Sequence, residues 1–148
     1  MVVGRLPVFV YGTLRPGEAN HPRLLRGRTA AQTPAVLAGA LLYQGPGYPY
    51  AVDDPGGGEI HGELIDPRPE AYEAVLADLD RLEEYVPGAP GNLYERVVRE
   101  VRPAAGGVRR AWVYLAATAT TRILRANGVR IPGGDWKSRR GSGGRGHE

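Results

Sequence analysis

The sequence predicts an α+β fold built on a mostly antiparallel sheet, one that can close into a barrel. Three observations lead to this prediction. Apolar runs typical of strands outnumber helical patterns, the two kinds of pattern do not alternate regularly, and the chain contains no internal repeat. The 148 residues, 42% of them hydrophobic, are enough for one domain with a core of its own.

The first predicted strand covers residues 6–11, an apolar run that stops at Gly12. Residues 15–22 contain two prolines and a glycine and predict a loop, which leads into a short helix at residues 23–27. Residues 35–43 predict a second strand.

Residues 45–50 and 53–58 are rich in glycine and proline and predict turns. Residues 59–65 alternate between two faces, as a strand does. Two further runs, at 96–101 and 108–115, are separated by Pro-Ala-Ala-Gly-Gly, which predicts a hairpin.

One long helix is predicted over residues 69–85. Asp66, Pro67 and Pro69 supply start signals, and Pro87 with the glycine after it ends the helix. This helix is the element whose face pattern carries the most information about a site.

On a helical wheel with Tyr72 at zero, Glu83 falls at about 20° and Glu84 at about 120°. The apolar side chains form one stripe between about −80° and 40°, made of Tyr72, Val75, Leu76, Leu79 and Leu82. Glu83 therefore points where the core is expected, and Glu84 points away from it. Three interpretations are open: Glu83 escapes to solvent at a frayed helix end, pairs with a buried arginine, or serves as a general base in a pocket.

Residue usage excludes several kinds of site. The chain has no cysteine, its only lysine is Lys137, and its first serine is Ser138. Residues 1–136 therefore lack a Ser, Cys or Lys nucleophile and a P-loop lysine. The three histidines, His21, His61 and His147, show no helical metal-ligand spacing, so we predict no metal site.

The basic character belongs to the C-terminal segment. Residues 137–148 hold four of the 19 cationic and one of the 16 acidic residues, so residues 1–136 are balanced. We predict a domain over residues 1–136, turn-rich from 126, and a disordered Gly/Arg tail at 137–148. A balanced body argues against a nucleic-acid binder. We recognise no signal peptide or membrane span and expect a cytoplasmic location.

Residues 11–15, Tyr11-Gly12-Thr13-Leu14-Arg15, follow the first strand directly. A strand that stops at glycine can turn consecutive backbone N–H groups toward one point, and such a concavity binds anions. Thr13 adds a hydroxyl group. The alternative is an ordinary turn between a strand and a loop, where glycine allows the chain to bend.

Taken together, these segments resemble the gamma-glutamyl cyclotransferase-like family, which includes small AIG2-like and butirosin-type proteins. Four motifs in the family's order carry the resemblance, over about residues 7–136: Phe9-Val10-Tyr11-Gly12-Thr13-Leu14-Arg15; Gly47-Tyr48-Pro49; Leu79-Asp80-Arg81-Leu82-Glu83 followed by Tyr94-Glu95-Arg96; and Ile131-Pro132-Gly133-Gly134-Asp135-Trp136.

The resemblance implies a small mixed barrel with flanking helices. It also implies an enzyme that cyclises a gamma-glutamyl group to 5-oxoproline and releases the attached amine. The family's catalytic glutamate corresponds to Glu83, and its substrate-cradling loop to Tyr11, Gly12, Thr13 and Leu14. The family usually has glycine after the catalytic glutamate, where this chain has Glu84.

The implied reaction needs no cofactor or metal, because the substrate's own amine is the nucleophile. The expected partner is a small gamma-glutamyl molecule, without nucleic acid or membrane; a monomer is favoured, with the oligomeric state left open. Tyr94 and Tyr114 are candidates for the pocket wall or ordinary strand aromatics. Loops at 45–58 and 86–93 are expected to surround the leaving amine. The competing hypotheses are a non-catalytic domain that binds a small carboxylate and weak nucleic-acid attachment through the tail.

Overall fold

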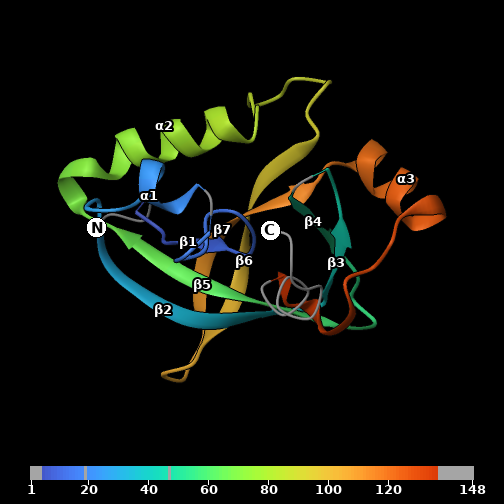
Figure 1. The fold of residues 1–148 in the computed structure, drawn as a ribbon, viewed down its shortest axis with the longest axis horizontal. Coiled ribbons are helices and arrows are strands. Elements are labelled where there is room, and N and C mark those ends of the chain that lie inside the picture. Colours follow the sequence, from blue (N-terminus) through green and yellow to red (C-terminus); the bar gives the residue numbers. More distant parts are fainter. Residues whose placement is uncertain (1–4, 19, 47, 137–148) are drawn as a thin grey trace.

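The computed structural model describes residues 5–18, 20–46 and 48–136. Five strands form a closed barrel (Figure 1) in the order β1-β5-β2-β6-β7. Their bounds are Val8–Val10 for β1, Thr29–Ala38 for β2, Glu59–Pro67 for β5, Tyr94–Pro103 for β6 and Arg109–Ala116 for β7. β1 runs parallel to β7, and the other paired neighbours are antiparallel. The predicted mixed, mostly antiparallel barrel is confirmed, while the predicted tail lies outside the described residues.

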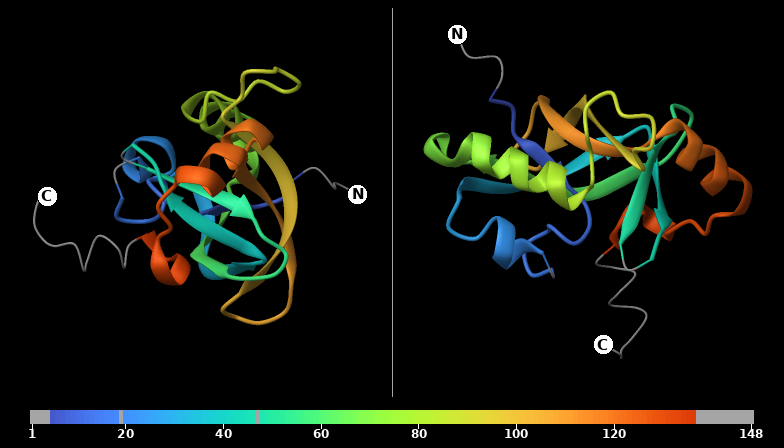
Figure 2. Two further views of the ribbon diagram at one scale, coloured as in Figure 1. Left: turned by 90° about the vertical axis from the view of Figure 1, so that its right-hand side faces the viewer. Right: turned by 90° about the horizontal axis from the view of Figure 1, so that it is seen from above.

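A two-stranded sheet and three helices surround the barrel. Figures 1 and 2 show α2 along the outside of the barrel and α3 beside the small sheet. The bounds are His21–Leu24 for α1, Ala40–Gln44 for β3, Pro49–Asp53 for β4, Tyr72–Leu82 for α2 and Thr118–Asn127 for α3; short 3₁₀ turns cover Pro69–Ala71 and Pro132–Gly134.

Strand β1 is buried on both faces, which explains its continuous apolar sequence. Phe9 packs into the barrel core, together with inward-facing residues of the other four barrel strands. Val8 and Val10 pack on the opposite face, against a second core shared with Val75 and Leu79 of α2. α2 therefore covers the outer face of β1, opposite the barrel core.

The predicted strand at residues 35–43 is wrong in two respects. The chain enters β2 earlier, at Thr29, and the predicted run is two strands in different sheets. Gly39 lies between them with a φ of 76°, in the left-handed region that interrupts a strand. Its backbone also bonds to two residues of the β4–β5 connection, Asp54 and Gly58. Residues after Gly39 consequently leave the barrel and pair with β4.

Other departures follow from weak local signals. β4 overlaps the two segments predicted as turns, 45–50 and 53–58, and begins with a proline, and α3 has no predicted counterpart. The sequence of α3 contains three threonines and buries only Leu124, so neither helix propensity nor an apolar stripe marks it. α1 begins at His21 and ends at Leu24, earlier than predicted. Asp66 belongs to β5, where it pairs with Arg109 instead of starting α2.

Arg15 joins three distant parts of the chain. Its guanidinium donates to both carboxylate oxygens of Glu63 on β5, at 2.7 and 3.2 Å, and to Asp135 Oδ1 at 2.8 Å. The arginine is only 6% exposed. The first and last of the sequence motifs, which contain Arg15 and Asp135, are thereby tied to one barrel strand.

We expect Arg15→Met to lower the free energy of unfolding by roughly 3 kcal/mol, because it leaves two carboxylates without their buried cation. The control is Arg109→Met. Arg109 makes a similar two-pronged contact with Asp66 at the surface, with 43% of its side chain exposed. Its loss is expected to cost less than about 1 kcal/mol. Urea unfolding measures both variants; equal losses would contradict this account.

Candidate active site

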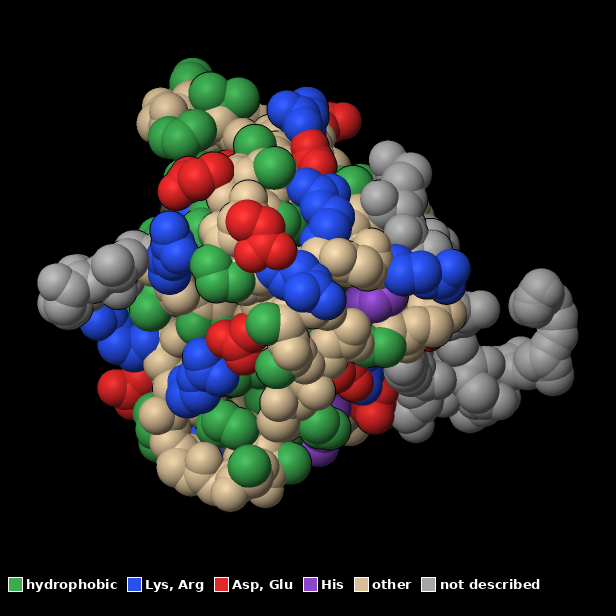
Figure 3. Space-filling model, turned by 90° about the vertical axis from the view of Figure 1, so that its left-hand side faces the viewer, with side chains coloured by type: hydrophobic (Ala, Val, Ile, Leu, Met, Phe, Trp, Pro, Cys, Tyr) green, Lys and Arg blue, Asp and Glu red, His purple; other side chains and the backbone are tan. Residues whose placement is uncertain are grey.

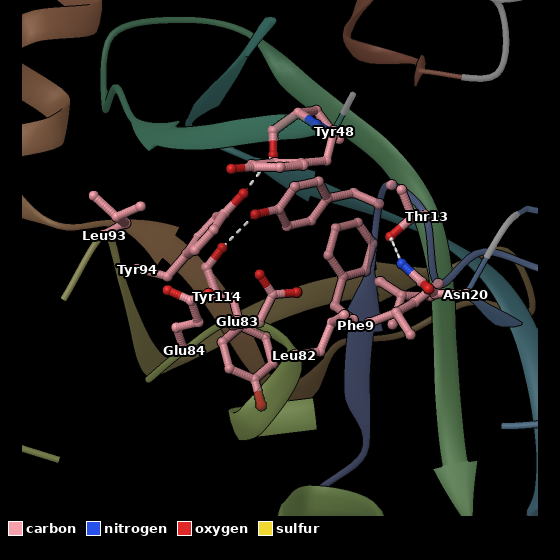
Figure 4. A pocket seen from close by; sticks show the side chains of 15 residues that line it. Phe9, Thr13, Asn20, Tyr48, Leu82, Glu83, Glu84, Leu93, Tyr94 and Tyr114 are labelled. Atoms are coloured by element: carbon pink, nitrogen blue, oxygen red, sulfur yellow. Dashed lines mark hydrogen bonds between the residues drawn. The ribbon is translucent and has the colours of Figure 1, made fainter. Parts of the chain in front are cut away.

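The end of β1, the start of β4 and the C-terminal end of α2 enclose a cavity of about 340 Å³ (Figure 4). Fifteen residues line it: Phe9, Val10, Tyr11, Gly12, Thr13, Leu14, Asn20, Tyr48, Pro49, Leu82, Glu83, Glu84, Leu93, Tyr94 and Tyr114. All seven site residues expected from the sequence are among them. The structure therefore brings these residues together around one cavity, while their roles stay predictions.

Glu83 is the residue that directly follows α2. It keeps helical backbone angles, and its N–H group donates to the Leu79 carbonyl. The helical periodicity therefore still holds at Glu83, as the wheel assumes. Figure 4 shows the Glu83 carboxylate pointing into the cavity. Among the described residues, Glu83 makes no ion pair.

The carboxylate of Glu83 lies in an environment that disfavours its charge. Removal from water raises the pKa of Glu83 from 4.5 to about 7, and the nearby negative charge of Asp80 acts in the same direction. The negative end of the α2 dipole also opposes a charge at this position. Glu83 can therefore exchange a proton near neutral pH.

The chain turns sharply after Glu83 because α2 ends in a Schellman motif. The Tyr85 N–H group donates to the Asp80 carbonyl at 2.8 Å, and the Glu84 N–H group donates to the Arg81 carbonyl at 3.1 Å. This motif requires a left-handed residue at position 84. Glu84 has a φ of 55° and is the only non-glycine residue with positive φ in the described ranges.

The expectation that Glu84 points away from the site needs correction. The wheel assumes a continuous helix, whereas the left-handed residue redirects the chain. Glu84 is exposed, yet its side chain lines the mouth of the same cavity as Glu83. Glycine would suit this position better, since glycine adopts positive φ without a steric cost.

Asp80 connects the last turn of α2 to the barrel through an ion pair and a hydrogen bond. Arg96 of β6 donates to both Asp80 oxygens, at 2.9 and 3.3 Å, and the Tyr114 hydroxyl of β7 donates to Asp80 Oδ1 at 2.6 Å. The guanidinium of Arg96 also lies 4.3 Å from the Trp112 ring centroid. These contacts fix the helix end whose next residue is Glu83.

The loop after β1 forms the opposite end of the cavity. Within the described residues, no backbone or side-chain oxygen accepts a hydrogen bond from the N–H groups of Gly12, Thr13 or Leu14. Such a run of unpaired N–H groups suits an anion. A Cβ atom at Gly12 would come within 2.7 Å of Pro49 Cδ, so glycine permits the close approach of the two segments.

Three tyrosines form much of the cavity wall, and each phenol has a fixed partner. The Tyr11 hydroxyl donates to the Tyr114 carbonyl, and the Tyr94 hydroxyl donates to the Pro49 carbonyl at 2.9 Å. The Tyr114 hydroxyl, in contrast, donates to Asp80 Oδ1. Tyr114 therefore contacts the cavity more through its backbone than through its phenol. Burial, with the negative charge of Glu83 adding to it, raises the pKa of Tyr11, which therefore stays protonated.

Several lining residues were not among the predicted site residues. Asn20 holds the loop by donating to the Thr13 hydroxyl at 2.9 Å. Tyr48, Pro49 and Leu93 come from the two loops that were expected to surround the leaving amine, but sequence alone did not single them out. The Tyr48-Pro49 pair lies within one of the four motifs, and this was the available signal.

In the ranges that the structure covers, no lysine, arginine or histidine lines the cavity. No group of three acidic, histidine or cysteine side chains suited to a metal occurs there either. No helix there combines the length and apolar character needed to cross a membrane. Figure 3 shows acidic and basic side chains interspersed on one face of the molecule, in keeping with the balanced charge of residues 1–136.

Fold and cavity define a small barrel protein in which a carboxylate with a raised pKa lies at one site with a loop whose backbone N–H groups have no acceptor among the described residues. Residues 8–138 match the family described as "Gamma-glutamyl cyclotransferase, AIG2-like". The chain belongs to this family, as the motifs predicted.

Two relatives are named as gamma-glutamyl cyclotransferases. The chain is 37% identical over 109 residues to the gamma-L-glutamyl-butirosin B gamma-glutamyl cyclotransferase of Niallia circulans, a match covering 73% of this chain and 65% of that enzyme. It is 33% identical over 112 residues to a putative gamma-glutamylcyclotransferase of Halalkalibacterium halodurans, covering 76% of this chain and 90% of the relative.

Solved structures share the fold. An AIG2-like protein of Mus musculus superposes with a TM-score of 0.70 at 22% identity, covering 97% of this chain and 95% of the other. An uncharacterized protein of Pyrococcus horikoshii gives a TM-score of 0.62 at 25% identity, with 93% and 95% covered. These likenesses agree with the closed mixed barrel.

The left-handed residue leads to a prediction about stability. Glu84→Gly is expected to be more stable than Glu84→Ala by about 1 kcal/mol, because only glycine relieves the left-handed strain. Both variants remove the same charge, so the difference between them reports the free-energy cost of positive φ at residue 84. Chemical unfolding measures the difference; equal stability of the two variants would contradict the Schellman geometry.

The raised pKa of Glu83 leads to a second prediction. The folded protein favours protonated Glu83, so this stabilising contribution is complete below about pH 4.5 and is lost as the pH rises through about 7. Glu83→Gln is neutral at every pH. Its free energy of unfolding should match that of the parent at low pH and exceed it increasingly up to neutral pH.

Unfolding at a series of pH values measures this difference. Glu73→Gln, which removes an exposed carboxylate from the first turn of α2, is the charge-matched control. If both variants differ from the parent by the same amount at every pH, Glu83 is not in the environment described.

Proposed function

We propose that this protein is a gamma-glutamyl cyclotransferase that converts a gamma-glutamyl amide into 5-oxoproline and a free amine. The observation that carries the proposal is the position of the Glu83 carboxylate. It lies within one cavity with three backbone N–H groups that have no hydrogen-bond acceptor in the described part of the chain, and its pKa is raised to about 7. The names of the relatives support the same reaction.

The reaction suits a site without a Ser, Cys or Lys nucleophile. The substrate's α-ammonium gives a proton to Glu83, and the resulting amine attacks the carbonyl carbon of its own side-chain amide. A five-membered ring forms, so positioning supplies much of the rate. Glu83 then returns the proton to the amide nitrogen as the carbon–nitrogen bond breaks. The ring nitrogen loses its second proton to the released amine, which leaves as an ammonium ion. No water, cofactor or metal enters this balance.

The cavity offers a place for each part of the substrate. The N–H groups of Gly12, Thr13 and Leu14 receive the α-carboxylate, since backbone donors are the positive partners available in a cavity without cationic side chains. Tyr11 and Tyr94 form the wall beside the glutamyl chain. Their own hydrogen bonds keep both rings in place, so the cavity is largely preformed.

Glu83→Gln is expected to reduce turnover at least about 100-fold while ligand binding is retained, because glutamine fills the same space but cannot accept a proton. Release of 5-oxoproline from a panel of gamma-glutamyl amides measures turnover, and calorimetry with 5-oxoproline measures binding. Glu73→Gln is the control.

Two results would contradict the proposal in different ways. Parental turnover by Glu83→Gln, or loss of turnover in Glu84→Gln alone, would show that the base is wrongly assigned. Binding of 5-oxoproline by the parent without release of product from any amide would instead favour a non-catalytic domain that binds a small carboxylate.

A further inference from the structure

We propose that Glu84 determines specificity and selects gamma-glutamyl amides whose leaving amine carries a second, positively charged nitrogen. The inference rests on the proposed function and adds the charge of the leaving group to it. It starts from a residue that the proposed reaction does not use. Glu84 occupies a left-handed position where glycine would be favoured, yet it carries a carboxylate at the mouth of the cavity.

The two halves of the cavity differ in what they can bind. In Figure 4, the loop with Thr13 and Asn20 lies on one side of Glu83, and Glu84 and Leu93 lie on the other. If the glutamyl carboxylate is held by the loop, the amide carbonyl comes to the Glu83 carboxylate. The leaving amine then extends past Glu83 toward Glu84 and Leu93.

The charge at the leaving-group end is negative and uncompensated. Among the described residues, Glu84 has no cationic partner, and no cationic side chain lines the cavity. Leu93 is 45% exposed beside it and offers an apolar surface to a short alkyl chain. The rings of Tyr48 and Tyr94, which also line the cavity, provide faces that attract a cation.

A leaving group therefore meets an alkyl-binding surface followed by a carboxylate. An ammonium group beyond the alkyl chain gains a favourable contact with Glu84. A carboxylate at the same place is repelled, because nothing at this end neutralises it. The covalent steps are those proposed above: the same carbon–nitrogen bond forms and the same one breaks, and the second nitrogen takes no part.

The test uses three amides with leaving groups of matched length: the gamma-glutamyl amides of 1,4-diaminobutane, pentylamine and 4-aminobutanoate. At about pH 8 their leaving groups carry a positive charge, no charge and a negative charge. We expect kcat/KM to fall in that order, by roughly two- to fivefold at each step, as is typical of exposed charges. Added salt should narrow the range.

Two variants test whether the charge of Glu84 causes this order of kcat/KM values. Glu84→Gln and Glu84→Gly both remove the carboxylate, the first with the backbone strain and the second without it. Both are expected to lose the preference for the cationic amide over the anionic one. Glu73→Gln, with a charge removed from the far end of α2, is expected to keep it.

The outcomes separate this inference from the function on which it rests. No product from any of the three amides would overturn the proposed cyclotransferase activity. Turnover of all three without charge preference, or a preference that persists in both Glu84 variants, would overturn the role of Glu84 alone. Loss of the preference only in Glu84→Gly would assign it to the backbone and equally overturn the proposal.

Discussion

The ion pair between Asp80 and Arg96 is the contact on which the geometry of the site depends. It joins the last turn of α2 to β6, and the Tyr114 hydroxyl adds a bond from β7 to the same carboxylate. Without this clamp, the helix end would be free to fray, as helix termini do, and Glu83 would reach water. The clamp has a second effect, because the negative charge of Asp80 helps to keep Glu83 protonated up to neutral pH. One carboxylate thus both positions the proposed base and adjusts its proton affinity.

At the end of α2, two different requirements fall on adjacent residues. Glu83 must present its carboxylate to the cavity, and Glu84 must adopt positive φ. The Schellman motif turns the chain away directly after Glu83, so this carboxylate remains within the cavity. The next residue must take positive φ, and in this chain it is a glutamate. The backbone strain that Glu84 brings is not needed for the fold, which glycine would serve better. In our proposal, the carboxylate at this position binds the charged end of the leaving amine.

Local sequence patterns were sufficient to predict the elements whose buried apolar residues recur at a regular spacing. The helix stripe predicted that Glu83 points inward, and the apolar run before Gly12 predicted the buried strand β1. The same reasoning failed where tertiary contacts override local signals. Gly39 divides a run that looks like one strand, and α3 contains three threonines among its ten residues. The helical wheel failed at Glu84 because periodicity ends at a left-handed residue. Asn20 and Leu93 reach the cavity through loop conformations that no periodic pattern encodes.

The central claim is that Glu83 is a carboxylate held in a desolvated cavity and ready to exchange a proton near neutral pH. The most direct measurement is an NMR titration of the carboxyl carbons in the ligand-free protein, with Glu83→Gln identifying the resonance. The account predicts a midpoint at about pH 7 for Glu83. A midpoint near 4.5, the value of an ordinary glutamate, would contradict it.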